Sequence, residues 1–266
     1  MEAYEAMQTV DFGYSAAAPV AAEQHGHVMI GALSVSDLTY DNGAGGRARA
    51  TLIVPPRPNG TAVVLAHGGT ADGRHYFLAE ATDLANQGMT TLLTAYSLPE
   101  KHGDQQATGE GVRTAVLIQR RALDVLTTWV DPPPDRLCYF GHSNGAFMGC
   151  LLSAVEPRLY ALALASFGTG TLRRLAAESM PRDPTSDAYL EFLGRFDPAP
   201  YVAVPGPRRL LFQHGRDDPA VLRSEAVALF EAAAEPRDYR EYAADHDTVT
   251  PAEARADRIR LYTSEG

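Results

Sequence analysis

The spacing of apolar residues along this chain predicts strands and helices that follow one another in turn. Apolar and polar residues alternate over residues 32–40 and 47–54, and the residues between these stretches favour a turn, which predicts a β-hairpin. Residues 61–66 are almost entirely apolar, as in a strand that is buried on both faces. Further strands are expected at 89–96, 136–140, 161–167, 208–213 and 239–243, and helices at 75–87, 112–130, 144–155, 222–234 and 251–262. This alternation predicts an α/β fold with a mostly parallel, twisted sheet of about eight strands and helices on both faces.

Two segments fall outside this alternation. Residues 1–30 show little periodicity and predict an N-terminal arm, so that residues 31–266 form a single domain. Residues 168–207 are too many for an ordinary connection between a strand and a helix, and they contain helix-compatible stretches at 172–178 and 186–195. We expect a small lid insertion there, and a plain surface excursion is the alternative.

Composition and charge narrow the class of protein. The 266 residues are 45% hydrophobic and 21% charged, and a globular chain of this length buries roughly three-quarters of its unfolded surface. The formal net charge of −10 disfavours nucleic acid and anionic membranes as partners. No apolar stretch approaches the roughly 18 residues of a membrane span, and the acidic first residues lack the features of a secretory signal. We therefore expect a cytoplasmic protein.

The chain contains only two cysteines, Cys138 in an expected strand and Cys150 in the helix that follows. Both lie among apolar residues, which is typical of reduced cysteines in a hydrophobic core. Cysteines and histidines do not occur at the spacings of a metal site. We therefore expect no metal.

Residues 137–148 carry the strongest functional signal. They join an apolar strand, the pentapeptide Gly141-His142-Ser143-Asn144-Gly145 and an apolar helix. Glycines two residues on either side of Ser143 allow strand and helix to pack closely, so the hydroxyl stands exposed at a sharp turn. This pattern predicts a nucleophile elbow, and a serine in an ordinary tight turn is the alternative.

A serine hydroxyl is a weak nucleophile at neutral pH, so it needs a base that accepts its proton and an acid that orients the base. Two histidines follow Ser143, namely His214 at the end of an expected strand and His246 in a polar loop. The loop position favours His246 as the base. Asp217 and Asp218 come shortly after His214 and are the candidates for the acid, although either could instead cap the next helix.

Negative charge on an attacked carbonyl oxygen needs backbone N–H donors. Asn144 offers one donor at the start of the helix after the elbow. The second is expected from the glycine-containing turn after the strand at 61–66, where Gly69 is favoured over Thr70. Candidate substrate contacts near these donors are Thr70, Tyr76, Tyr96 and His142, although aromatic residues at such positions are also common in cores.

Taken together, these segments resemble the α/β-hydrolase family, and within it the carboxylesterases of the dienelactone-hydrolase and acyl-peptidase-like branch. The resemblance covers nearly everything from residue 32 to residue 262. It is carried by the hairpin end at 54–56, the turn at 67–69, the elbow at 141–145, the turn at 214–218 and His246. The resemblance implies a catalytic triad of Ser143, Asp218 and His246, with Asp218 selected over Asp217 by its register after His214-Gly215.

The implied function is a serine hydrolase that acts without a cofactor on a small-molecule ester or lactone through an acyl-enzyme. Three other functions stay open: a lyase or acyl-removing enzyme of natural-product biosynthesis that uses the same triad, a thioesterase, and a catalytically silent binding module. Lys101 is the only lysine among the 23 basic residues, and this arginine bias fits a GC-rich bacterial genome.

Overall fold

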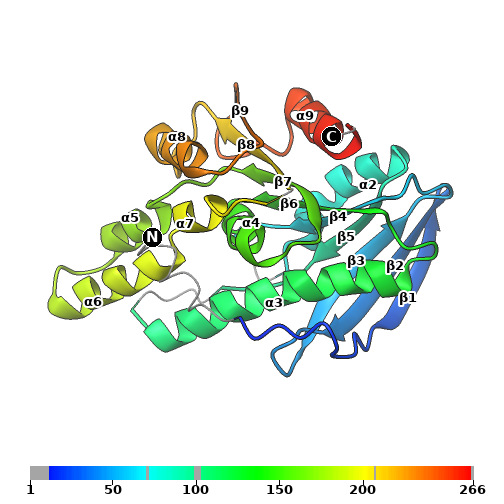
Figure 1. The fold of residues 1–266 in the computed structure, drawn as a ribbon, viewed down its shortest axis with the longest axis horizontal. Coiled ribbons are helices and arrows are strands. Elements are labelled where there is room, and N and C mark those ends of the chain that lie inside the picture. The colour runs from blue at the N-terminus through cyan, green and yellow to red at the C-terminus, as the bar shows by residue number, and fades with distance from the viewer. Residues whose placement is uncertain (1–11, 70–71, 99–102, 207, 265–266) are drawn as a thin grey trace.

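A computed structural model describes residues 12–69, 72–98, 103–206 and 208–264. Within these residues the strands form one nine-stranded sheet in the order β1-β2-β3-β5-β4-β6-β7-β8-β9 (Figure 1). The first strands pair antiparallel, and all pairs from β5 onward are parallel. The strands are β1 (Glu23–Ile30), β2 (Leu33–Asp41), β3 (Arg47–Val54), β4 (Thr61–Ala66), β5 (Thr90–Thr94), β6 (Arg136–His142), β7 (Leu159–Ala165), β8 (Arg209–Gly215) and β9 (Arg237–Tyr242).

The sheet has one strand more than the eight or so that we expected, and the additional strand is β1. It lies within residues 1–30, where we expected an arm, and it pairs antiparallel with β2 at the edge of the sheet. All eight residues of β1 are exposed. A strand that buries no side chain leaves no hydrophobic alternation in the sequence, because backbone hydrogen bonds and polar surface contacts, such as that between His25 and Thr39, attach it to the sheet.

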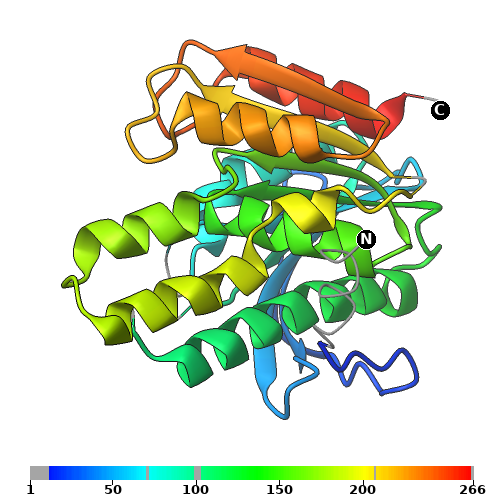
Figure 2. The ribbon, with the colours of Figure 1, turned by 60° about the vertical axis from the view of Figure 1, so that its left-hand side comes forward.

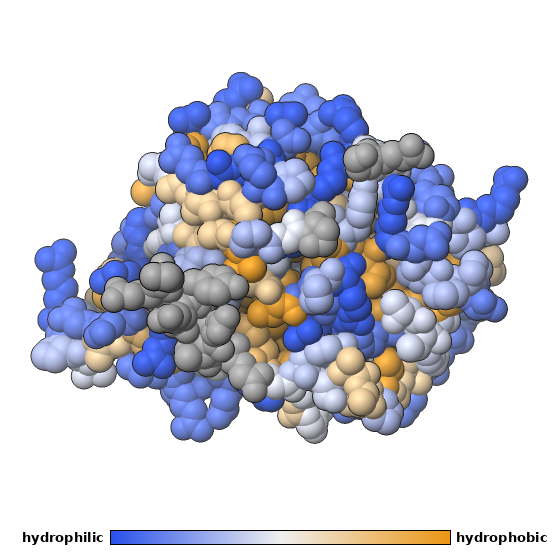
Figure 3. Space-filling model, viewed as in Figure 1, coloured by the Kyte–Doolittle hydropathy of each residue, from blue (hydrophilic) through white to orange (hydrophobic). Residues whose placement is uncertain are grey.

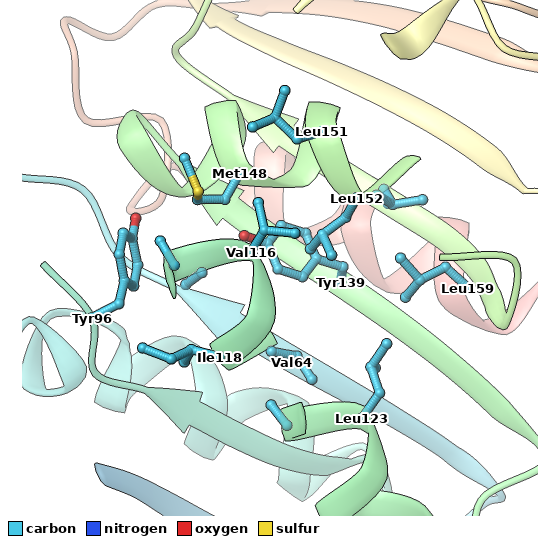
Figure 4. Close-up of a cluster of buried hydrophobic side chains, with 14 of the residues drawn as sticks. Val64, Tyr96, Val116, Ile118, Leu123, Tyr139, Met148, Leu151, Leu152 and Leu159 are labelled. Atoms are coloured by element: carbon cyan, nitrogen blue, oxygen red, sulfur yellow. The ribbon is translucent and has the colours of Figure 1, made fainter. Parts of the chain in front are cut away.

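Helices cover both faces of the sheet, as the alternation of elements predicts. Successive residues of a strand point to opposite faces, and Val64 accordingly packs with the helices on one face while Val63 and Leu65 pack with those on the other. Figure 4 shows part of the first cluster, where Val64 and Tyr139 of the sheet meet helix side chains such as Val116. One face carries α2 (Leu78–Asn86) and α9 (Ala252–Thr263), and the other carries α3 (Gln105–Trp129), α4 (Asn144–Val155) and α8 (Arg223–Ala232).

Helix α3 begins at Gln105, seven residues before the expected start at 112. The side chain of Asp104 accepts a hydrogen bond from the N–H of Ala107 at 2.9 Å and so caps the helix. Its first two turns contain Gly109, Gly111 and polar residues. These turns therefore lack the apolar periodicity that marks the buried part of the helix.

The described residues of the long connection between β7 and β8 form four short helices. Figure 2 shows α5 and α6 side by side next to the first turns of α3. Ala176, Tyr189 and Leu193 form a small hydrophobic cluster within this insertion. The helices are α5 (Thr171–Ser179), α6 (Pro184–Leu193), η2 (Gly194–Phe196) and α7 (Ala199–Val202).

On the face drawn in Figure 3, hydrophilic side chains cover most of the rim and apolar ones reach the surface towards the middle. Within the described ranges, none of the helices combines the length and the apolar character that crossing a membrane would require.

Candidate active site

Ser143 lies at the turn between β6 and α4, with a φ of 55° and a ψ of −120°. A positive φ is strained for a residue with a side chain, at a cost of about 1–3 kcal/mol. The N–H of Ser143 donates to the carbonyl of Ala165 at 2.8 Å, which attaches the turn to the end of β7. A Cβ on Gly141 would overlap the backbone of α4, and a Cβ on Gly145 would overlap the carbonyl of Ala66 at the end of β4, so the close packing of α4 against the strand ends requires glycine at both positions.

His246 and Asp218 are joined by a hydrogen bond of 2.8 Å between Nδ1 and Oδ2. The Asp218 carboxylate is buried, and its Oδ1 accepts the N–H groups of Ala220 at 2.8 Å and Val221 at 3.0 Å. Burial tends to raise the pKa of Asp218, but the bonds from His246 and the two amides outweigh burial and hold the pKa below its usual value. The carboxylate accepts from Nδ1–H, which leaves Nε2 of His246 as a proton acceptor.

Ser143 and His246 line one cleft of about 490 Å³ at the carboxyl ends of the parallel strands. Gly68 and Gly69, which follow β4, line the same cleft. A Cβ on Gly68 would lie 2.6 Å from the Cβ of Ser143, so the backbone after β4 passes directly beside the serine. The structure therefore brings the predicted nucleophile, base and oxyanion turn to one edge of the sheet.

Two backbone segments lie where an oxyanion would need donors. Asn144 is the first residue of α4, and the first N–H groups of a helix have no acceptor within the helix. The positive end of the helix dipole lies at the same place. Gly69 has a φ of 72°, and a Cβ there would meet open space, so its backbone borders the cleft.

The carbonyl oxygen of His246 accepts two hydrogen bonds from the ends of β6 and β7. His142 Nε2–H donates at 2.7 Å, and the hydroxyl of Ser166 donates at 2.9 Å. Burial lowers the pKa of His142 to about 4, so the ring is neutral at neutral pH. Ser166 has a φ of 56° and is not part of any local motif, so sequence reasoning missed it. Together the two donors hold the backbone of the histidine loop.

Arg258 of α9 supports the same loop. It is fully buried and donates to the carbonyls of Thr248 at 3.2 Å and Val249 at 2.8 Å. It also donates to Glu80 Oε1 of α2 at 2.7 Å and to Gln213 Oε1 at 2.8 Å. An arginine in a helix gives no sequence signal of such a role, and this residue was also missed.

The four predicted substrate contacts differ in where they lie. Tyr76 and His142 line the cleft, and the Tyr76 hydroxyl donates to Asp247 Oδ1 at 3.2 Å. Tyr96 does not line it, because its ring is buried against His67 and its hydroxyl donates to the His67 carbonyl. We therefore assign no substrate contact to Tyr96. Thr70 lies outside the described residues.

The other candidates from the sequence lie away from the cleft. His214 is buried at the end of β8, where burial lowers its pKa, and the side chain of Asp217 is exposed. Cys138 and Cys150 are free and buried, and burial raises the pKa of Cys138 to about 12. In the described part of the chain, no group of three or more His, Cys, Asp or Glu side chains is arranged to hold a metal ion.

No protein-family model matches the chain, and neither does the sequence of any curated protein. Many solved structures share its fold. Acetyl xylan esterase 1 from Thermoanaerobacterium sp. JW/SL YS485 aligns at a TM-score of 0.74 and 16% identity, over 98% of this chain and 92% of that one. An acetyl xylan esterase from Paenibacillus sp. R4 aligns at 0.71 and 18% identity, again over 98% and 92%. A glucuronoyl esterase from Solibacter usitatus aligns at 0.71 and 12% identity, over 98% and 90%. The order of its strands and these alignments show that the chain has the α/β-hydrolase fold.

Proposed function

We propose that this protein is a serine esterase that cleaves a carboxylic ester or lactone of a small molecule through an acyl-enzyme on Ser143. One observation carries the proposal. Ser143, on a strained turn, lines the same cleft as His246, and the ring of His246 is hydrogen-bonded to the buried carboxylate of Asp218. A nucleophile, a base and an orienting acid are the groups that acyl transfer requires.

In the proposed reaction, His246 Nε2 takes the proton of Ser143 as Oγ attacks the ester carbonyl. The N–H groups of Asn144 and Gly69 stabilise the resulting oxyanion. His246 then gives the proton to the alcohol oxygen as the carbon–oxygen bond breaks and the acyl-enzyme forms. Water releases the acid by the same steps, with His246 again acting as base, and Asp218 stabilises the imidazolium throughout.

The esterase activity of the structural neighbours supports this function over the alternatives. A lyase, an acyl-removing enzyme or a thioesterase would use the same attacking serine, and no feature of the cleft favours any of them. A silent binding module would gain nothing from a strained serine beside a His–Asp pair. We also propose that residues 31–266, together with strand β1, act as one domain and that the insertion at 168–207 is a lid over the site.

The function is tested with p-nitrophenyl butyrate and a fluorophosphonate probe. We expect wild-type protein to hydrolyse the ester and to be labelled at Ser143, while Ser143→Ala loses both labelling and at least about 10⁴-fold in kcat. Ser224→Ala, which changes an exposed serine on α8, is the matched control and should retain both. Equal turnover by Ser143→Ala and wild type would contradict the proposal, as would wild-type protein that neither reacts with the probe nor cleaves esters.

A further inference from the structure

A second, smaller space has Asn144 in its wall, and Asn144 directly follows Ser143, which lines the cleft. This side pocket has a volume of about 110 Å³. Besides Asn144, its walls include Val112 of α3, Phe147 of α4, and Leu193 and Phe196 of the insertion. The side pocket is mostly apolar in its residue types, whereas histidines, aspartates and glycines dominate the larger cleft.

Contacts between helices hold the walls of the side pocket in place. The hydroxyls of Thr108 on α3 and Tyr189 on α6 share a buried hydrogen bond of 2.9 Å. Gln105 Nε2 of α3 donates to the carbonyl of Ala188 at 3.2 Å, one residue before Tyr189. The insertion is thus attached to α3 at two neighbouring points. The volume of the side pocket should limit the length of the group that it can bind, because closely packed walls of this kind do not move apart easily.

The chemistry of the triad decides which half of an ester each space receives. His246 must reach the oxygen of the departing alcohol in order to protonate it. The alcohol therefore lies on the side of His246, in the cleft of about 490 Å³. The acyl chain then extends from the attacked carbon towards Asn144, whose N–H would bind the oxyanion, and beyond it towards Phe147.

We propose that the side pocket binds the acyl chain and that its volume selects esters of short aliphatic acids with a larger alcohol group. This inference rests on the proposed esterase function. An apolar cavity of roughly 150 Å³ accommodates benzene, with six carbon atoms. A pocket of about 110 Å³ therefore holds a chain of about four carbons. Phe196 and Val112 should set this limit, since both side chains line the side pocket.

The inference is tested with p-nitrophenyl esters of straight-chain acids of two to twelve carbons. We expect kcat/KM of the wild type to be highest between three and five carbons and to fall at least about tenfold by eight carbons. A matched pair, glyceryl monobutyrate and glyceryl monooctanoate, tests the same preference with a natural type of alcohol. The butyrate should be cleaved faster by a similar factor.

Two variants should move the optimum in opposite directions. Phe196→Ala enlarges the side pocket and should shift the optimum to six or more carbons, whereas Val112→Phe fills it and should shift the optimum to acetate. Leu175→Ala on α5 is the matched control, because Leu175 is 38% exposed and does not line the side pocket. Its chain-length profile should equal that of the wild type. Thermal melting, followed by circular dichroism, establishes which variants are folded.

The outcomes separate the two proposals. A wild-type optimum at eight carbons or more, or a profile that the folded variants leave unchanged, would overturn the assignment of the side pocket while the esterase function stands. If Ser143 fails to react with the probe and no ester in the series is cleaved, both proposals are overturned.

Discussion

Asp217 and Asp218 are adjacent carboxylates with opposite surroundings. Asp217 is exposed, and its backbone N–H donates to the carbonyl of Ala244. The carboxylate of Asp218 is buried and accepts hydrogen bonds from the His246 ring and from two backbone amides. Only Asp218 can therefore fix the tautomer of His246, with the proton on Nδ1 and the lone pair of Nε2 towards the cleft.

Replacing Asp218 by Asn should reduce activity strongly without unfolding the protein. The amide can donate to Nδ1 and thereby stabilise the wrong tautomer, so we expect kcat for p-nitrophenyl butyrate to fall by about 10³–10⁴-fold with little change in KM. Asp217→Asn is the matched control and should stay within about twofold of the wild type. Comparable losses in the two variants would show that Asp218 has no special role in orienting the histidine.

Helices α2 and α9 are connected by a buried ion pair that also supports the histidine loop. Glu80 and Arg258 are both fully buried in their side chains and lie 2.7 Å apart. Arg255, one turn earlier on α9, binds the second oxygen of Glu80 at 2.7 Å. Since Arg258 also donates to the carbonyls of Thr248 and Val249, the position of α9 is coupled to the loop that carries His246.

Arg258→Met should therefore affect both stability and catalysis. Removing one partner of a buried ion pair leaves one oxygen of the Glu80 carboxylate and two carbonyls without their Arg258 donor, and we expect the free energy of unfolding to fall by about 3–5 kcal/mol. Among molecules that remain folded, kcat should also decrease because the histidine loop loses two of its anchors. Urea unfolding gives the first quantity, and turnover normalised to probe-labelled enzyme gives the second.

Arg260→Met on the same helix provides the comparison. Arg260 is 69% exposed in its side chain and pairs with Asp257 at the surface. Exposed pairs contribute less than about 1 kcal/mol, so this variant should unfold almost like the wild type and keep its kcat. If Arg258→Met were equally mild, the ion pair would not be a support of the loop.

At the scale of the whole molecule, buried histidines at the carboxyl edge of the sheet make folding sensitive to acid. Burial lowers the pKa of His67, His142 and His214, and for His142 the folded value is about 4 against an ordinary 6.5. Between these two pH values the unfolded chain binds a proton at residue 142 that the folded protein does not. The free energy of unfolding must therefore fall as the pH decreases from about 6.5 to about 4.

His142→Gln isolates the share of this sensitivity that belongs to one residue. The amide of glutamine can still donate to the His246 carbonyl but does not titrate. A shift from 6.5 to about 4 corresponds to about 3 kcal/mol, so the variant should lose about that much less stability than the wild type between pH 6.5 and 4. Urea unfolding at pH 7, 5.5 and 4 measures both curves, and parallel curves would contradict the assignment.

The fold was predictable to a large extent because its signals are local. Apolar runs such as residues 61–66 and the periodic apolar residues of the helices indicate which side chains are buried. The alternation of strands and helices along the chain predicts a parallel sheet. Strand β1 was missed because none of its residues is buried. The first turns of α3 were missed because Asp104 and not a hydrophobic stripe marks their beginning.

The sequence by itself determined the alternating α/β architecture and the elbow at Ser143, since both follow from patterns within a few residues of chain. Only the tertiary structure decided what surrounds that serine: the buried state of Asp218, the two side-chain donors on the His246 carbonyl, the support from Arg258 and the size of the side pocket. These features join residues up to 178 positions apart, as between Glu80 and Arg258. Local patterns encode burial and turns, whereas the pairing of distant groups depends on how the sheet brings its strand ends together.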